Sequence, residues 1–194
     1  MTDRHIKKIQ AVAIGASTGG PSALEYLISK LPKDLDIPIF IVQHMPKDFT
    51  TSFAMRLDKA SQVKVVEVED KMKIEKGVVF IAPGDFHMTV ERDTIRLDSR
   101  AKLFGVRPCV DYLFKSAAEV YGENLLGIIL TGMGKDGSDG MHTIKINGGY
   151  NIAQDEGSSV IYGMPGNAVE SGVVDSILSL EDISKVLNNL TKVK

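Results

Sequence analysis

The chain has 194 residues, of which 43% are hydrophobic and 25% are charged, and its formal net charge is −2. This length and composition predict one globular domain over residues 1–194, without nucleic acid as a partner and without insertion into a membrane. The single cysteine, Cys109, excludes an internal disulfide, and the start of the chain has no apolar signal segment. Both observations favour a cytoplasmic protein.

Apolar runs alternate with segments of helical spacing along the first half of the chain. Residues 11–14 are a short apolar run that ends at Gly15, and residues 21–31 repeat apolar side chains at helical intervals. The predicted elements are, in order, strand 11–14, helix 21–31, strand 38–42, a helix capped by Thr50 or Thr51, and strands 63–68 and 78–82.

The second half continues the alternation after a hairpin whose turn is Arg92-Asp93. Its predicted elements are strands 87–90 and 94–97, helix 110–121, strand 125–130, helix 140–146, strand 151–153, helix 166–171, strand 176–180 and helix 181–190. Residues 125–130 are all apolar except Gly127, as expected for a strand in the middle of a parallel sheet. The order predicts an α/β fold with a doubly wound, mostly parallel sheet and a small antiparallel hairpin addition.

Three segments place a reactive side chain just past a predicted strand. They are Gly15-Ala16-Ser17-Thr18-Gly19-Gly20, Gln43-His44-Met45-Pro46 and Leu130-Thr131-Gly132-Met133-Gly134-Lys135-Asp136-Gly137. Because the carboxyl ends of parallel strands converge on one edge of a sheet, Ser17, His44 and Asp136 are expected to meet there. These are the nucleophile, general base and orienting carboxylate of a serine hydrolase.

The loop around Ser17 has other interpretations. A glycine-rich turn between a strand and a helix is typical of phosphate binding, but this one lacks the lysine of a Walker loop and the spacing of a dinucleotide fingerprint. Residues 15–19 match the Gly-x-Ser-x-Gly turn that exposes a catalytic serine. The order Ser17, His44, Asp136 differs from the serine, acid, histidine order of the α/β-hydrolases, so the standard assignment to that fold family fails.

Four histidines compete for the role of the base. His44 ends a strand beside the serine loop, whereas His5 lies in a polar tail, His87 begins the hairpin and His142 lies on a helix. The placement favours His44, with a structural role for His87. No two histidines have a metal-ligand spacing such as His-x-x-x-His, so no metal is predicted.

Asp136 is favoured as the acid because it follows the most apolar strand, in a loop with three glycines. The alternatives are Asp70, Asp85, Asp111 and Asp139. A glycine-rich loop of this kind can also turn backbone N–H groups toward a substrate and form an oxyanion hole.

The three segments, in this order, resemble the catalytic domain of the chemotaxis protein-glutamate methylesterases, the CheB family. The similarity runs over nearly the whole chain. It also includes Ile81-Ala82-Pro83-Gly84-Asp85-Phe86-His87-Met88, Arg107-Pro108-Cys109-Val110-Asp111, Ala153-Gln154-Asp155 and Gly163-Met164-Pro165. By this resemblance the family's triad maps to Ser17, His44 and Asp136.

The resemblance implies an activity and a partner. The substrate would be the γ-glutamyl methyl ester on cytoplasmic helices of chemoreceptors, hydrolysed to glutamate and methanol, with deamidation of receptor glutamines as a second reaction. No cofactor is implied. The backbone N–H of Met133 becomes the candidate oxyanion donor, and Thr18 and Gly134 are further candidates for lining the site.

Two departures from the family pattern stand out. Cys109 occupies a position where the family usually has serine, and the expected effect is on a helix start. Family members also usually carry an N-terminal receiver domain, which has no counterpart in these residues, so a separate regulatory chain is a candidate partner. Two alternatives remain open: a non-catalytic receptor-docking or anion-binding module of the same fold, and an esterase or amidase for another protein.

Overall fold

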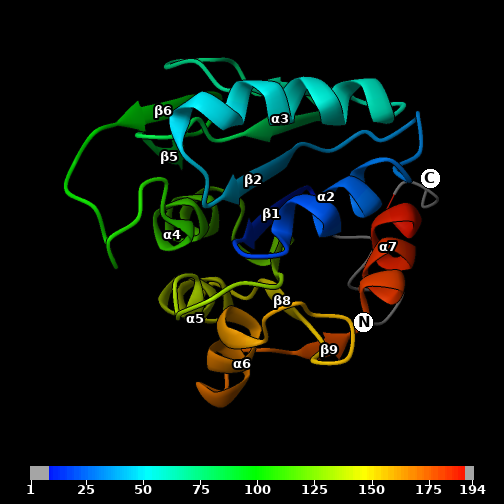
Figure 1. The fold of residues 1–194 in the computed structure, drawn as a ribbon, viewed down its shortest axis with the longest axis vertical. Helices are drawn as coiled ribbons and strands as arrows, with labels where there is room; N and C mark the ends of the chain where they lie inside the picture. The colour runs from blue at the N-terminus through cyan, green and yellow to red at the C-terminus, as the bar shows by residue number, and fades with distance from the viewer. Residues whose placement is uncertain (1–8, 191–194) are drawn as a thin grey trace.

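A computed structural model describes residues 9–190 of the chain (Figure 1); His5, expected in a polar tail, lies outside them. Seven strands form one parallel sheet in the order β3-β4-β2-β1-β7-β8-β9, and two more form a separate antiparallel pair. The strands are β1 (Ala11–Ala16), β2 (Ile39–Gln43), β3 (Lys64–Glu67), β4 (Val78–Ile81), β5 (His87–Val90), β6 (Ile95–Asp98), β7 (Leu125–Ile129), β8 (Tyr150–Gln154) and β9 (Ser176–Leu178). This arrangement confirms the predicted α/β fold with its hairpin addition.

Helices cover both faces of the sheet, which is why the central strands β2, β1 and β7 are buried throughout and almost wholly apolar. One core packs α2, α3 and α7 on the sheet, and the other packs α4, α5, α6 and the β5–β6 hairpin on the opposite face (Figure 1). The helices are α2 (Gly20–Ile28), α3 (Lys47–Ala60), α4 (Val110–Tyr121), α5 (Ser138–Ile146), α6 (Gly163–Glu170) and α7 (Leu180–Asn189), with a 3-10 turn at Gly122–Asn124. Within residues 9–190, no helix is long and apolar enough to cross a bilayer.

The predicted start of α3 is wrong. The helix begins at Lys47, after Pro46, so Thr50 and Thr51 lie inside it and cap nothing. Their hydroxyls instead donate to the Glu67 carboxylate at the end of β3, at 2.5 and 2.6 Å. A proline before a helix is itself a start signal, and here it outweighs the threonines.

Other boundaries differ by a few residues. The helix predicted at 166–171 begins at Gly163, and the helix predicted at 140–146 begins at Ser138. The helix predicted to reach residue 31 ends at Ile28. Glycines or prolines lie at the starts of α5 and α6 and interrupt the apolar period there, and helix ends are in general the boundaries that sequence patterns locate least well.

The central strand β1 positions the site. It pairs with β2 on one side, where Ala16 lies opposite Gln43, and with β7 on the other, where Gly15 lies opposite Ile129. All three strands run parallel and therefore end at the same edge of the sheet. The segments that follow them are the three glycine-rich or polar segments singled out in the sequence.

Candidate active site

Ser17 occupies a tight turn directly after β1. Its backbone N–H donates to the Thr131 carbonyl at 3.0 Å, and its carbonyl accepts from the Gly20 N–H at 2.8 Å, where α2 begins. The side chain is half-buried, and the neighbouring Thr18 is exposed. Ser17 therefore lies at the edge of the sheet, and hydrogen bonds to its N–H and its carbonyl fix its backbone.

His44 follows β2 at the same edge. Its N–H donates to the Ala16 carbonyl at 3.0 Å, and the Gln43 side-chain amide donates to the carbonyls of both Ser17 and His44 at 3.0 Å. Ser17 and His44 line one cavity of about 420 Å³. No hydrogen bond joins the Ser17 hydroxyl to the His44 ring among the residues described, a separation common in catalytic pairs without substrate.

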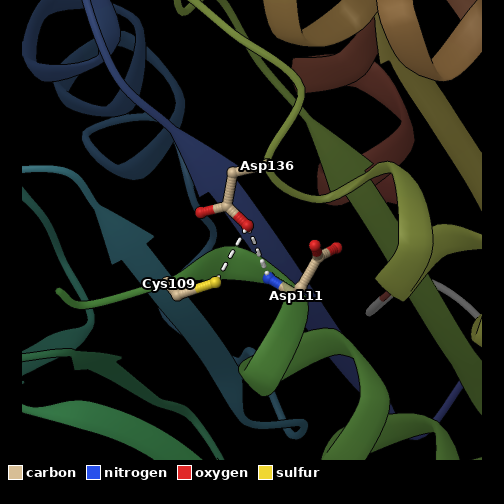
Figure 2. Close-up of side chains that lie close together, drawn as sticks. All are labelled: Cys109, Asp111 and Asp136. Carbon is tan, nitrogen blue, oxygen red and sulfur yellow. Dashed lines mark hydrogen bonds between the residues drawn. The ribbon is translucent and has the colours of Figure 1, made fainter. Parts of the chain in front are cut away.

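Asp136 lies in the loop after β7 and contacts His44. Its Oδ2 lies 2.7 Å from His44 Nε2. The carboxylate also accepts from the Val110 N–H at 2.7 Å. Figure 2 shows two further donors, the Asp111 N–H at 2.9 Å and the Cys109 thiol at 3.0 Å. Four donors thus converge on one carboxylate that is 2% exposed.

These donors decide the charge of Asp136. Burial by itself raises the pKa of a carboxyl group, but the hydrogen bonds from His44, the Val110 N–H and Cys109 outweigh it and hold the pKa of Asp136 below its ordinary value. Burial, and after it the charge of Asp136, raises the pKa of Cys109 far above its ordinary range. Asp136 is therefore an anion at neutral pH, and Cys109 is a thiol that donates to it.

The orientation of the His44 ring follows from this charge. An ionised carboxylate can only accept, so Nε2 carries the proton and donates to Asp136. In the neutral ring, the other nitrogen, Nδ1, then carries a lone pair that can accept a proton. In the chymotrypsin template the two nitrogens have the opposite assignments.

The 131–137 loop passes close to Ser17. A Cβ added at Gly132 would lie 2.7 Å from the Ser17 Cβ, so only glycine allows this approach. The Thr131 hydroxyl ties the two loops by donating to the Thr18 carbonyl at 2.9 Å. The N–H groups of Met133 and Gly134 have no acceptor within residues 9–190, and the Met133 side chain is 69% exposed. The predicted oxyanion donors thus lie in a loop held against the serine.

The competing acids lie elsewhere. Asp70 accepts from Arg96 and the Leu97 N–H on the hairpin, and Asp139 is exposed on α5. Asp85 lines a separate cavity of about 280 Å³ that also reaches His44. Asp111 is buried beside Asp136, but its carboxylate accepts from backbone N–H groups. Asp136 is the carboxylate hydrogen-bonded to His44.

The other two described histidines are away from the serine. His87 is buried, its Nε2 lies 3.2 Å from the Ala101 carbonyl, and its ring contacts Tyr112 edge-on. Burial lowers the pKa of His87, and the bond to Ala101 only partly opposes this. His142 is exposed on α5.

Cys109, Asp111 and Asp136 bring three metal-ligand atoms within 4.8 Å of one another (Figure 2). Metal ligands must be deprotonated and free to coordinate. Here the thiol keeps its proton, and both Asp136 oxygens already accept two hydrogen bonds each. The cluster suits a hydrogen-bonded support for the acid better than a metal site.

The sequence did not reveal this support. Residues 107–111 stood out only as part of the family resemblance, and their contact with Asp136 requires α4 to begin against the 136–140 segment. The sequence signal that could have indicated this support is Pro108, which shortly precedes the buried start of α4. The role of the Gln43 amide in joining Ser17 and His44 was also missed.

A serine, a histidine and a buried aspartate at one edge of a parallel sheet define a candidate serine hydrolase of the α/β class. A family model described as CheB methylesterase matches residues 12–187, and the chain belongs to that family. The resemblance noted from the sequence is thereby confirmed.

Curated relatives and a crystal structure agree with this membership. Proteins from Clostridium acetobutylicum and Pyrococcus horikoshii, both named protein-glutamate methylesterase/protein-glutamine glutaminase, are 48% and 46% identical over 91% of the chain. The match covers 51% and 49% of their own lengths, so the chain spans about half of each relative. The crystal structure of the Thermotoga maritima CheB methylesterase catalytic domain superposes with a TM-score of 0.91 at 44% identity, covering 94% of this chain and 98% of that one.

Proposed function

We propose that the chain is a serine hydrolase that removes methyl groups from γ-glutamyl methyl esters in proteins, with Ser17 as nucleophile, His44 as general base and Asp136 as orienting acid. One observation carries the proposal: Ser17 and His44 share a cavity, while His44 Nε2 donates to a buried carboxylate 2.7 Å away. The names of the relatives supply the substrate class. All three residues lie in segments that follow strands of one sheet, which supports our proposal of a single catalytic domain over residues 1–194.

The geometry supports a definite sequence of steps. His44 Nδ1 accepts the Ser17 proton as Oγ attacks the ester carbonyl, and Asp136 stabilises the imidazolium that forms. The N–H groups of Met133 and Gly134 are the proposed oxyanion donors, each worth about 3 kcal/mol in comparable sites. Methanol leaves with the proton from His44. Water then attacks the acyl-enzyme, His44 again serves as base, and glutamate is released.

Methylated helices of chemoreceptors are the proposed protein substrate, which places the reaction in the cytoplasm. An amide carbonyl can enter the same site, with ammonia as the leaving group, so deamidation of glutamine is proposed as a second reaction. The names of the relatives include both activities. A separate regulatory chain is a further proposed partner.

Methanol release from methylated chemoreceptor fragments tests the proposal directly. The purified chain should release methanol stoichiometrically with ester loss, and an equally methylated unrelated helical protein should be a much poorer substrate. Equal rates on both would favour a general protein esterase. No release from either, together with no labelling by a fluorophosphonate probe, would favour the non-catalytic binding module.

A further inference from the structure

A second buried carboxylate lies beside the acid of the proposed triad. Asp111 is in the first turn of α4 and is 0% exposed, and its backbone N–H donates to Asp136 Oδ1 at 2.9 Å (Figure 2). Its own carboxylate has no bond to His44. The mechanism proposed above therefore leaves Asp111 unused.

The hydrogen bonds of the two aspartates are reciprocal. Asp136 accepts the N–H groups that begin α4, whereas Asp111 Oδ1 accepts the N–H groups of Gly137 and Gly140 at 3.0 and 2.7 Å. Each carboxylate thus holds the segment that carries the other. The 136–140 segment is fixed immediately after Asp136 and again at the first turn of α5.

Close packing makes this exchange possible. A Cβ added at Gly140 would lie 2.5 Å from the Phe114 Cβ and 3.2 Å from the Asp111 Cα, so only glycine brings the α5 backbone onto α4. The side chain of Asp111 then reaches the N–H groups of Gly137 and Gly140 at the start of α5. If α4 and α5 lay farther apart, the N–H groups of Gly137 and Gly140 would be buried without acceptors.

The arrangement is unfavourable for Asp111 itself. Its Oδ2 is buried without a partner in the described chain. Burial, with the charge of Asp136 as a further cause, raises the pKa of Asp111 to about 6, although the Gly140 N–H acts in the opposite direction. Side chains that break the ordinary rules of burial are concentrated at functional sites.

We propose that Asp111 is a positioning residue for the triad: its carboxylate fixes the 136–140 segment so that Asp136 meets His44 in the orientation needed for proton transfer. Asp111 touches no substrate and acts only through Asp136. The inference rests on the proposed function and adds a residue to it.

The test compares Asp111→Ala with Asp111→Asn. Alanine removes the acceptor, so kcat should fall about 100-fold, the cost of a misplaced catalytic group, while KM changes by less than about threefold. Asparagine keeps an acceptor oxygen for Gly137 and Gly140 and should restore kcat to within about tenfold of wild type. Asp139→Ala, an exposed aspartate on the same segment, is the matched control and should match wild type.

A readout that needs no substrate separates positioning from stability. The His44 Nε2 proton, bonded to Asp136, should give a downfield proton resonance in wild type and Asp111→Asn and lose it in Asp111→Ala. An Asp111→Ala protein that keeps this resonance and its kcat overturns the proposal, and so does an Asp111→Asn protein that loses both. If Asp111→Ala does not fold, Asp111→Ser, too short to reach both glycines, takes its place with the same expectations.

The two proposals fail in different ways. If wild type hydrolyses no ester but the resonance follows the Asp111 variants as described, the proposed function is wrong and the positioning role stands. If wild type is active and the His44 resonance is the same in all Asp111 variants, the positioning role is wrong and the proposed function stands.

Discussion

The two ends of the proposed triad are built differently. At the acid end, Asp136 is buried and its carboxylate accepts hydrogen bonds from four donors. Around Ser17 the structure is open: the serine is half-buried, Thr18 is exposed and the cavity lining includes the exposed Phe49. The contrast separates two tasks, because an orienting charge must be rigid, whereas a nucleophile must admit a protein substrate.

Removing the proposed nucleophile should have the largest effect on activity and almost none on the fold. Ser17→Ala deletes one hydroxyl at the open end, so ester hydrolysis should fall about 10⁶-fold. The urea unfolding midpoint should stay within error of wild type, because the Ser17 backbone bonds remain. Methanol release and equilibrium unfolding measure the two quantities. A large loss of stability would mean that the serine end is as tightly built as the acid end.

Changing the acid should affect both activity and stability. Asp136→Asn removes the charge that sets the His44 tautomer and places an NH₂ group among donors, so kcat should fall about 10⁴-fold. The unfolding free energy should fall by about 2–3 kcal/mol, since donors at the α4 start lose a charged acceptor. Asp85→Asn, in the neighbouring cavity, is the control and should stay within about twofold of wild type. If Asp85→Asn lost activity and Asp136→Asn kept it, Asp85 would be the orienting acid.

Cys109 tests how much each donor to Asp136 matters. Cys109→Ala removes one donor from the buried carboxylate, which should lower kcat several-fold and destabilise the fold by about 1–2 kcal/mol. Cys109→Ser supplies a hydroxyl donor in the same place and should retain more of both. Steady-state kinetics and urea unfolding distinguish the variants. Equal losses in the two would assign the effect to packing of the sulfur.

Asp111 should make the stability of the acid end depend on pH. Its folded pKa is raised to about 6 from an ordinary 3.8, so the folded state binds a proton in that window before the unfolded state does. Wild type should therefore gain stability relative to Asp111→Asn as pH falls from 7 to 4, by no more than about 1.4 kcal/mol per pH unit. Unfolding midpoints of both proteins across this range measure the difference. A constant difference would mean that the pKa of Asp111 is not raised in the folded protein and that its carboxyl group titrates as it does in the unfolded chain.

The sequence predicted the open end of the site better than the buried end. Ser17 and His44 directly follow their strands, so strand order alone brings them together. The support of Asp136 depends on where α4 begins relative to a loop 25 residues further along, and on a glycine contact between two helices. Apolar periodicity locates helices and strands but carries no information on such contacts. The same limit explains the misplaced start of α3, because the Thr50 hydroxyl donates to Glu67 on β3 and does not cap the helix.

The place of β1 between β2 and β7 also has a consequence for how the protein reaches its working form. β1 and β2 are close in the chain, whereas β7 joins β1 only after a loop of more than a hundred residues has closed, and non-local pairings of this kind are slow to form. Ser17 and His44 belong to the early pair and Asp136 to the late one. During refolding, recovery of esterase activity should accordingly lag behind formation of the first helices and strands, and a chain cut before Leu125 should never acquire it.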